Sequence, residues 1–206
     1  MTLLRLYKEE ITGFNVIIQK LSDRGEYSIS AMILHHYMLW MKPRLEPAHR
    51  KFQITNDEVE EIKRFFEEYY LPSLEQLQLA IEYFNKSYIE PYTPRDAFLD
   101  LMIAMENLYL KGITDELGFR LRMRMARVLG SDYQTRKDIY DFVKKAYVLR
   151  GKIVHGEKHD PLSQKYLFKI RQLVRDSIKL FLKNPQMRDD LDDLLLKSEL
   201  NLRISK

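Results

Sequence analysis

Helical periodicity governs most of this 206-residue chain. From residue 55 onward, apolar side chains recur every three or four positions, and no stretch alternates at the period of two that a half-buried strand needs. The stripes break at Pro72, Pro91, Gly130 and Pro185, which divide the region into helices of ordinary length. The fold class is therefore predicted to be all-α, an antiparallel helical bundle.

Capping residues indicate where individual helices begin. Thr55 and Glu58 have the spacing of a capping box, and Thr93-Pro94 is typical of an N-cap followed by a first-turn proline. The helix after Pro94 is apolar nearly all round up to Gly112, which predicts a central, buried position. The remaining helices are expected at about 55–72, 73–90, 115–129 and 136–149, and from Asp160-Pro161 to just before Pro185.

The chain divides into three regions by pattern. Residues 1–54 form an N-terminal extension, in which the apolar runs 14–18 and 27–33 fit either short strands or helical turns. Residues 55–184 form the helical bundle, and residues 185–206 form a C-terminal amphipathic tail.

The amino-acid composition excludes several kinds of functional site. The chain has no cysteine, so disulfides, iron–sulfur clusters, thiolate zinc sites and a cysteine nucleophile are excluded. Charged side chains interrupt the first twenty residues, and no apolar stretch approaches the roughly 18 residues of a membrane span. We expect a soluble, cytoplasmic protein with no membrane partner.

The net charge of +4 is unevenly distributed. Residues 56–92 carry 3 basic and 9 acidic side chains, whereas residues 93–206 carry 23 basic and 16 acidic ones. This asymmetry fits a surface that faces a polyanion, and it also fits helices whose solvated faces simply differ in charge.

Arg150 is the first candidate functional residue. It follows Val143 by seven positions and Ala146 by four, so it falls on the core-facing line of its helix. A guanidinium on that line is costly unless it is paired or faces a cleft or a subunit interface. Glu106, a carboxylate inside the most apolar helix, is the predicted partner.

His155 is the second candidate. It lies five residues after Arg150, about 140° further around an ideal helix, so a straight helix would not direct both side chains at one point. A bend at Gly151 or Gly156, or a second copy of the motif across a dimer axis, would bring them together.

Three segments, Asp96–Leu108, Phe119–Gly130 and Lys145–Gly156, together resemble the HEPN family, in particular its ApeA-like branch. From Asp96 to Gly156 they span about a third of the chain, in the family's order and spacing. The resemblance implies an antiparallel helical bundle, often a homodimer, and a metal-independent endoribonuclease whose Arg-x4-6-His motif maps onto Arg150 and His155. In many active members a polar residue follows the arginine, whereas Gly151 follows it here.

The two side chains suit metal-free RNA cleavage, in which the ribose 2′-hydroxyl attacks the adjacent phosphorus. Histidine titrates near neutral pH, so His155 is the predicted general acid or base. The forked, permanently charged Arg150 is the predicted phosphate clamp, with Glu106 orienting it. No cofactor or metal is expected, and the implied setting is host defence or a toxin–antitoxin system.

Further basic residues are candidates for RNA contacts. Arg120, Arg124 and Arg127 recur at i, i+4 and i+7 opposite the apolar stripe, and Lys152 lies within the motif. An ordinary solvated helix face explains the arginines equally well. His155 and His159 have a spacing that could hold zinc on a helix, but Gly156 and the Asp160-Pro161 start favour a loop.

The rival interpretation is a non-catalytic HEPN-like module for dimerisation or for binding nucleotide or RNA, in which Arg150 is structural. A neutralising or regulatory partner protein is compatible with either interpretation.

Overall fold

The computed structural model of the chain describes residues 6–7, 18–20, 27–29, 58–68, 76–88, 93–189 and 191–196. Within these ranges the predicted all-α helical bundle is confirmed. Its helices are α3 (Glu58–Glu68), α4 (Gln78–Lys86), α5 (Pro94–Tyr109), α6 (Leu117–Leu129), α7 (Tyr133–Val154), α8 (Gln164–Lys183) and α9 (Leu191–Leu196), with a 3-10 turn, η2 (Pro185–Arg188).

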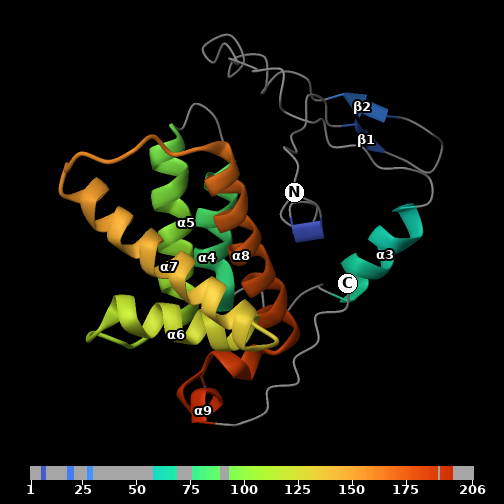
Figure 1. Cartoon of the computed structure of the whole chain (residues 1–206). Coiled ribbons are helices and arrows are strands. Elements are labelled where there is room, and N and C mark those ends of the chain that lie inside the picture. The colour runs from blue at the N-terminus through green and yellow to red at the C-terminus, as the bar shows by residue number, and fades with distance from the viewer. Residues whose placement is uncertain are drawn as a thin grey trace.

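The centre of the bundle is α5, as its apolar sequence predicts. It contacts α4, α6, α7 and α8, and Figure 1 shows α4, α5 and α8 side by side with α6 lying across one end. Its largest side chains are fully buried: Phe98, Leu101, Met102, Met105 and Leu108. Burying such side chains contributes about 1.5–3 kcal/mol each, so this helix carries much of the fold's stability.

The start of α5 forms as expected. The Thr93 side chain accepts a hydrogen bond from the Asp96 amide, the Asp96 carboxylate accepts one from the Thr93 amide, and Pro94 occupies the first turn. The helix ends at Tyr109 rather than Gly112. The Tyr109 hydroxyl is buried and hydrogen-bonded to Ser177 Oγ on α8 at 2.8 Å.

The predicted helix 136–149 is too short at both ends, because α7 runs from Tyr133 to Val154. Asp132 caps it through a reciprocal pair of hydrogen bonds with Thr135, and the helix continues through Gly151. Both Arg150 and Gly151 therefore belong to one long helix. The helix is continuous at Gly151, one of the two positions considered for a bend.

The start of α8 also differs from expectation. Ser163, not Asp160, caps the helix, since its hydroxyl accepts a hydrogen bond from the Tyr166 amide at 3.2 Å. The residues between α7 and α8, including His159, form the predicted loop. This loop carries His155 out of the bundle and into solvent.

The two ends of the chain add short elements. Strands β1 (Ile18–Lys20) and β2 (Tyr27–Ile29) pair antiparallel, with Ile18 opposite Ile29, so the strand alternative holds there. The remainder of those two apolar runs, the Thr55 capping box and the helix start near residue 73 lie outside the described residues. At the other end, α9 packs on α6. None of the helices in the described ranges has the length and apolar character needed to cross a bilayer.

Candidate active site

The predicted pairing of Arg150 with Glu106 is present. Arg150 Nε on α7 lies 3.5 Å from Glu106 Oε1 on α5, and both side chains are partly buried, with 35% and 24% of their surfaces exposed. The contact is an ion pair without a hydrogen bond, because Glu106 Oε1 has no hydrogen-bond partner among the described residues. The guanidinium is held at the bundle surface with donors available to a further ligand.

Burial shapes the electrostatics around this pair. It raises the pKa of the Glu106 carboxyl above its ordinary value, and the Arg150 charge opposes that rise. The pKa of the nearby Tyr147 hydroxyl is also raised, first by burial and then by the Glu106 charge. The Tyr147 ring lies against Gly118 of α6, where an added Cβ would come within 2.7 Å of Tyr147 Cδ1. Glu106, Arg150 and Tyr147 therefore form one semi-enclosed cluster joining α5, α6 and α7.

His155 is placed differently. It is the C-cap residue of α7, its side chain is exposed, and its backbone amide donates to the Gly151 carbonyl at 3.0 Å. Five residues along an α-helix correspond to about 7.5 Å of rise and about 140° of rotation. The protomer therefore does not direct Arg150 and His155 at a common point.

Arg95 is a site residue that the sequence interpretation missed. Its Nη2 donates a 3.2 Å hydrogen bond to the Ile153 carbonyl at the C-terminal end of α7, two residues before His155. A cation there is favourable because it satisfies an otherwise unpaired carbonyl and complements the helix dipole. The signal was present in the sequence: a cation in the first turn of α5 opposes that helix's own dipole, which indicates a partner elsewhere.

The face of α7 that carries His155 is open. Val148 is 57% exposed and Val154 is 52% exposed, and a Cβ added at Gly151 would meet no described residue within 4 Å. A glycine inside a helix costs about 1 kcal/mol relative to alanine, and no described residue packs against Gly151 closely enough to require one. The site thus has an exposed apolar flank beside its histidine.

The expected arginine ridge on α6 is wrong for Arg124. That side chain is 4% exposed, and its guanidinium donates to Asp192 Oδ1 of α9 and to the Tyr109 carbonyl, each at 2.5 Å. Arg124 is buried because α9 packs over this part of α6. Arg120 Nη1 lies 3.8 Å from Asp192 Oδ2, and Arg127 is half-buried. Lys152 is exposed in the last turn of α7, as its predicted role requires.

In the described part of the chain, no group of three or more histidine or acidic side chains is arranged to hold a metal ion. No protein-family model, curated protein or solved structure matches the chain. The class that the fold defines is an all-α bundle, with a partly buried arginine–glutamate pair and an exposed histidine near the end of one helix.

Proposed function

We propose that the protein is a metal-independent endoribonuclease of the HEPN type, in which Arg150 and His155 are the catalytic residues. The observation that carries the proposal is the Arg150–Glu106 pair, which holds a guanidinium at the bundle surface one and a half turns before an exposed histidine. A fixed cation stabilises the charge that builds up on phosphoryl oxygens during cleavage. The HEPN resemblance of the surrounding segments supports RNA as the substrate.

In the proposed reaction, His155 takes the proton from the ribose 2′-hydroxyl or gives one to the departing 5′-oxygen. The 2′-oxygen forms a bond to phosphorus as the bond to the 5′-oxygen breaks, which leaves a 2′,3′-cyclic phosphate and a 5′-hydroxyl. Arg150 contacts the non-bridging oxygens through its forked N–H donors. Glu106 is a positioning residue, because it acts on the reaction through Arg150.

The proposal includes a homodimer, because one protomer does not bring Arg150 and His155 together. The exposed Val148 and Val154 and the open space at Gly151 are the features expected where a second helix approaches closely. In that arrangement His155 of one copy faces Arg150 of the other, and Arg95 fixes the end of the helix that presents the histidine.

The direct test is incubation of the purified full chain with single-stranded RNA in the presence of EDTA. We expect cleavage products with 2′,3′-cyclic phosphate ends, detected by resistance of the 3′ end to ligation until the cycle is opened and the resulting phosphate is removed. RNA that stays intact, or that is cut only when a divalent metal is supplied, would contradict the proposal. The alternative of a non-catalytic RNA-binding module would then be favoured, since the ion pair would serve structure alone.

Glu106→Gln separates positioning from stability. Burial raises the pKa of this carboxyl above its ordinary 4.5, so its ionisation disfavours the folded state, and stability from the protonated form is lost as pH rises through the folded pKa. The stability of the variant relative to wild type should therefore be lowest at acidic pH and should increase as the pH rises. Its cleavage rate should nevertheless fall about tenfold, because Arg150 loses its orienting charge.

The measurement for Glu106→Gln is urea denaturation at several pH values beside the cleavage rate. Glu82→Gln is a matched control, since Glu82 is an exposed acid on α4 that pairs with Lys86. If the cleavage rate of Glu106→Gln falls only where the folded state is itself destabilised, Glu106 is merely structural.

Gly151→Ala tests the dimer. In an isolated protomer the methyl group meets open space and alanine favours the helix, so the variant should be stabilised by about 0.5–1 kcal/mol. At a close helix–helix contact the same methyl group should weaken association. Thermal unfolding and sedimentation velocity distinguish the effects, with Gly151→Leu as the stronger variant. A dimer that Gly151→Leu leaves intact would place the interface elsewhere.

A further inference from the structure

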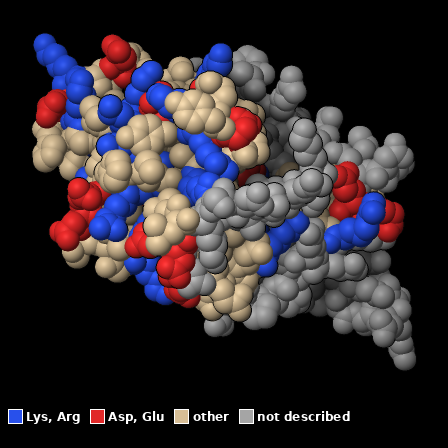
Figure 2. Space-filling view, turned by 60° about the horizontal axis from the view of Figure 1, so that its bottom comes forward, with Lys and Arg blue, Asp and Glu red and all other residues tan. Residues whose placement is uncertain are grey.

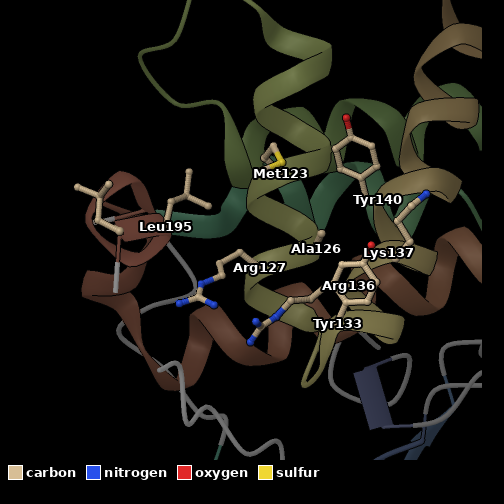
Figure 3. A pocket seen from close by; sticks show the side chains of 9 residues that line it. Met123, Ala126, Arg127, Tyr133, Arg136, Lys137, Tyr140 and Leu195 are labelled. Atoms are coloured by element: carbon tan, nitrogen blue, oxygen red, sulfur yellow. The ribbon is translucent and has the colours of Figure 1, made fainter. Parts of the chain in front are cut away.

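A second surface feature lies at the opposite end of α7 from His155. It is an open pocket of about 470 Å³ between α6, α7 and α9. Its apolar lining comes from Met123 and Ala126 of α6 and from Leu195 and Leu196 of α9. Figure 3 shows Tyr133 and Tyr140 of α7 beside Met123 and Ala126. The volume lies in the range of small-ligand sites.

The rim of the pocket is cationic. Arg127, Arg136 and Lys137 line it, and Lys137 is paired with Asp141 one turn along α7. Arg136 Nε donates to the Gly130 carbonyl at 2.9 Å, which anchors the side chain while a guanidinium retains other donors. Figure 2 shows Lys and Arg side chains interspersed with uncharged and acidic ones on the described face. The pocket therefore combines flat apolar surface with positive charge.

The aromatic side chains present faces that a flat ligand can use. Tyr133 is 77% exposed, so its ring is accessible to a ligand in the pocket. The Tyr140 ring already stacks with a cation, as Arg122 Cζ lies 5.1 Å from its centroid and 5.1 Å from that of Phe119. Aromatic rings beside cations are the recurrent platform for bases of single-stranded nucleic acid.

Lysines of α7 extend from this pocket toward the candidate active site. Tyr133, Lys137, Tyr140 and Lys144 follow one another at intervals of three or four positions, which places them on one helix face, and Lys144 is exposed. Beyond Lys144, the exposed Lys145 and Lys152 continue toward His155 beside the face with Val148 and Gly151 that the proposed dimer covers. From Tyr140 to His155 the helix rises about 22 Å, a span that several nucleotides of an extended strand can cover.

We propose that this pocket is an accessory binding site for single-stranded RNA, in which one base stacks on the exposed ring of Tyr133 while the backbone follows the lysines of α7 toward His155. The proposal rests on the proposed function for the identity of the strand as RNA. It assigns to Arg127 and Arg136 the phosphate next to the stacked base. The accessory site would select single-stranded over duplex RNA, since paired bases present no free face for stacking.

The test measures binding separately from cleavage. The probe is a fluorescent 2′-O-methyl RNA of about 12 nucleotides, which cannot be cut by 2′-hydroxyl attack and fits the site sizes of single-strand binders. Tyr133→Ala should weaken its binding about tenfold by fluorescence anisotropy, whereas Tyr133→Phe should bind as wild type does. Phe168→Ala is the matched control, because Phe168 is a 49% exposed aromatic residue on α8 that does not line the pocket.

Salt and competitors complete the design. Lys144→Ala should lower the slope of log affinity against log salt by about 0.7, the value for one lost phosphate contact on a single strand. Equal binding of wild type and Tyr133→Ala would overturn the proposal, as would equal affinity for duplex RNA. Binding of AMP that the RNA does not displace, or of an acidic peptide in preference to RNA, would also overturn it. If Tyr133→Ala weakens binding although native RNA is never cut, the accessory site stands and the proposed function fails.

Discussion

His155→Ala is expected to lower the rate of RNA cleavage by about 10²- to 10⁴-fold, the usual contribution of a positioned general acid or base. The fold should be unaffected, because the side chain is exposed and its ring makes no hydrogen bond within the described part of the chain. His159→Ala is the matched control: it removes a second exposed histidine from the same loop, whose Nδ1 contacts only its neighbour's carbonyl, that of Asp160, at 2.8 Å. Single-turnover cleavage of a labelled RNA measures all three proteins.

Arg150→Ala should produce a loss of similar size for a different reason, because it removes the charge that stabilises the phosphoryl oxygens. Arg150→Lys should recover part of the rate, since lysine keeps the charge but lacks the fork that contacts two oxygens. Neither variant should alter stability by more than a modest amount, as the pair with Glu106 is only half enclosed.

Mixing the two inactive variants tests where the site lies. If His155 of one copy faces Arg150 of the other, a heterodimer of His155→Ala and Arg150→Ala contains one intact site, and a fraction of the activity returns on mixing. If both residues act within one protomer, every chain in the mixture is defective and no activity returns. Retention of full cleavage by His155→Ala alone would refute its catalytic role.

The Arg150–Glu106 pair was predictable because two independent patterns met. Arg150 lies on the core-facing line of its helix, and a charge there needs a partner of opposite sign. Glu106 lies inside the helix whose apolar sequence marks it as central, so its side chain faces a helix packed against it. Periodicity thus indicated which helix face carries each residue, and the need to pair a partly buried charge indicated that the two residues contact each other.

The partners of Arg124 and Arg95 could not be identified from the sequence, because each partner lies on an element distant in sequence; for Arg95 the sequence indicated only that a partner exists. Arg124 is buried because α9, 68 residues later at Asp192, closes over α6. Arg95 reaches Ile153 across 58 residues. Periodicity states which face of a helix is apolar, but it does not state which short terminal helix will cover the polar face. The pocket depends on the same placement, since two of its lining residues belong to α9.

Asp192→Ala should cost about 1–3 kcal/mol of unfolding free energy, because it removes a partner from a buried guanidinium. The Arg124 side chain is 5% exposed, so it cannot exchange Asp192 for bulk water, and the Tyr109 carbonyl satisfies only part of its donors. The estimate stays below the 3–5 kcal/mol or so of a fully buried pair because the Asp192 side chain is itself 58% exposed. Asp193→Ala, which removes the adjacent exposed acid of α9, is the matched control and should change little.

Arg124→Met tells whether the cost arises from the unpaired charge or from the lost contact. It removes the buried cation and lets Asp192 return to solvent, so we expect it to be less destabilising than Asp192→Ala. The double variant should then be about as stable as Arg124→Met alone, because the other contact of Asp192 with α6, to Arg120 at 3.8 Å, is solvent-exposed and contributes little. Additive losses in urea denaturation would show that the two side chains act independently. In that case Leu191, which is 3% exposed, would be what holds α9 and the pocket wall in place.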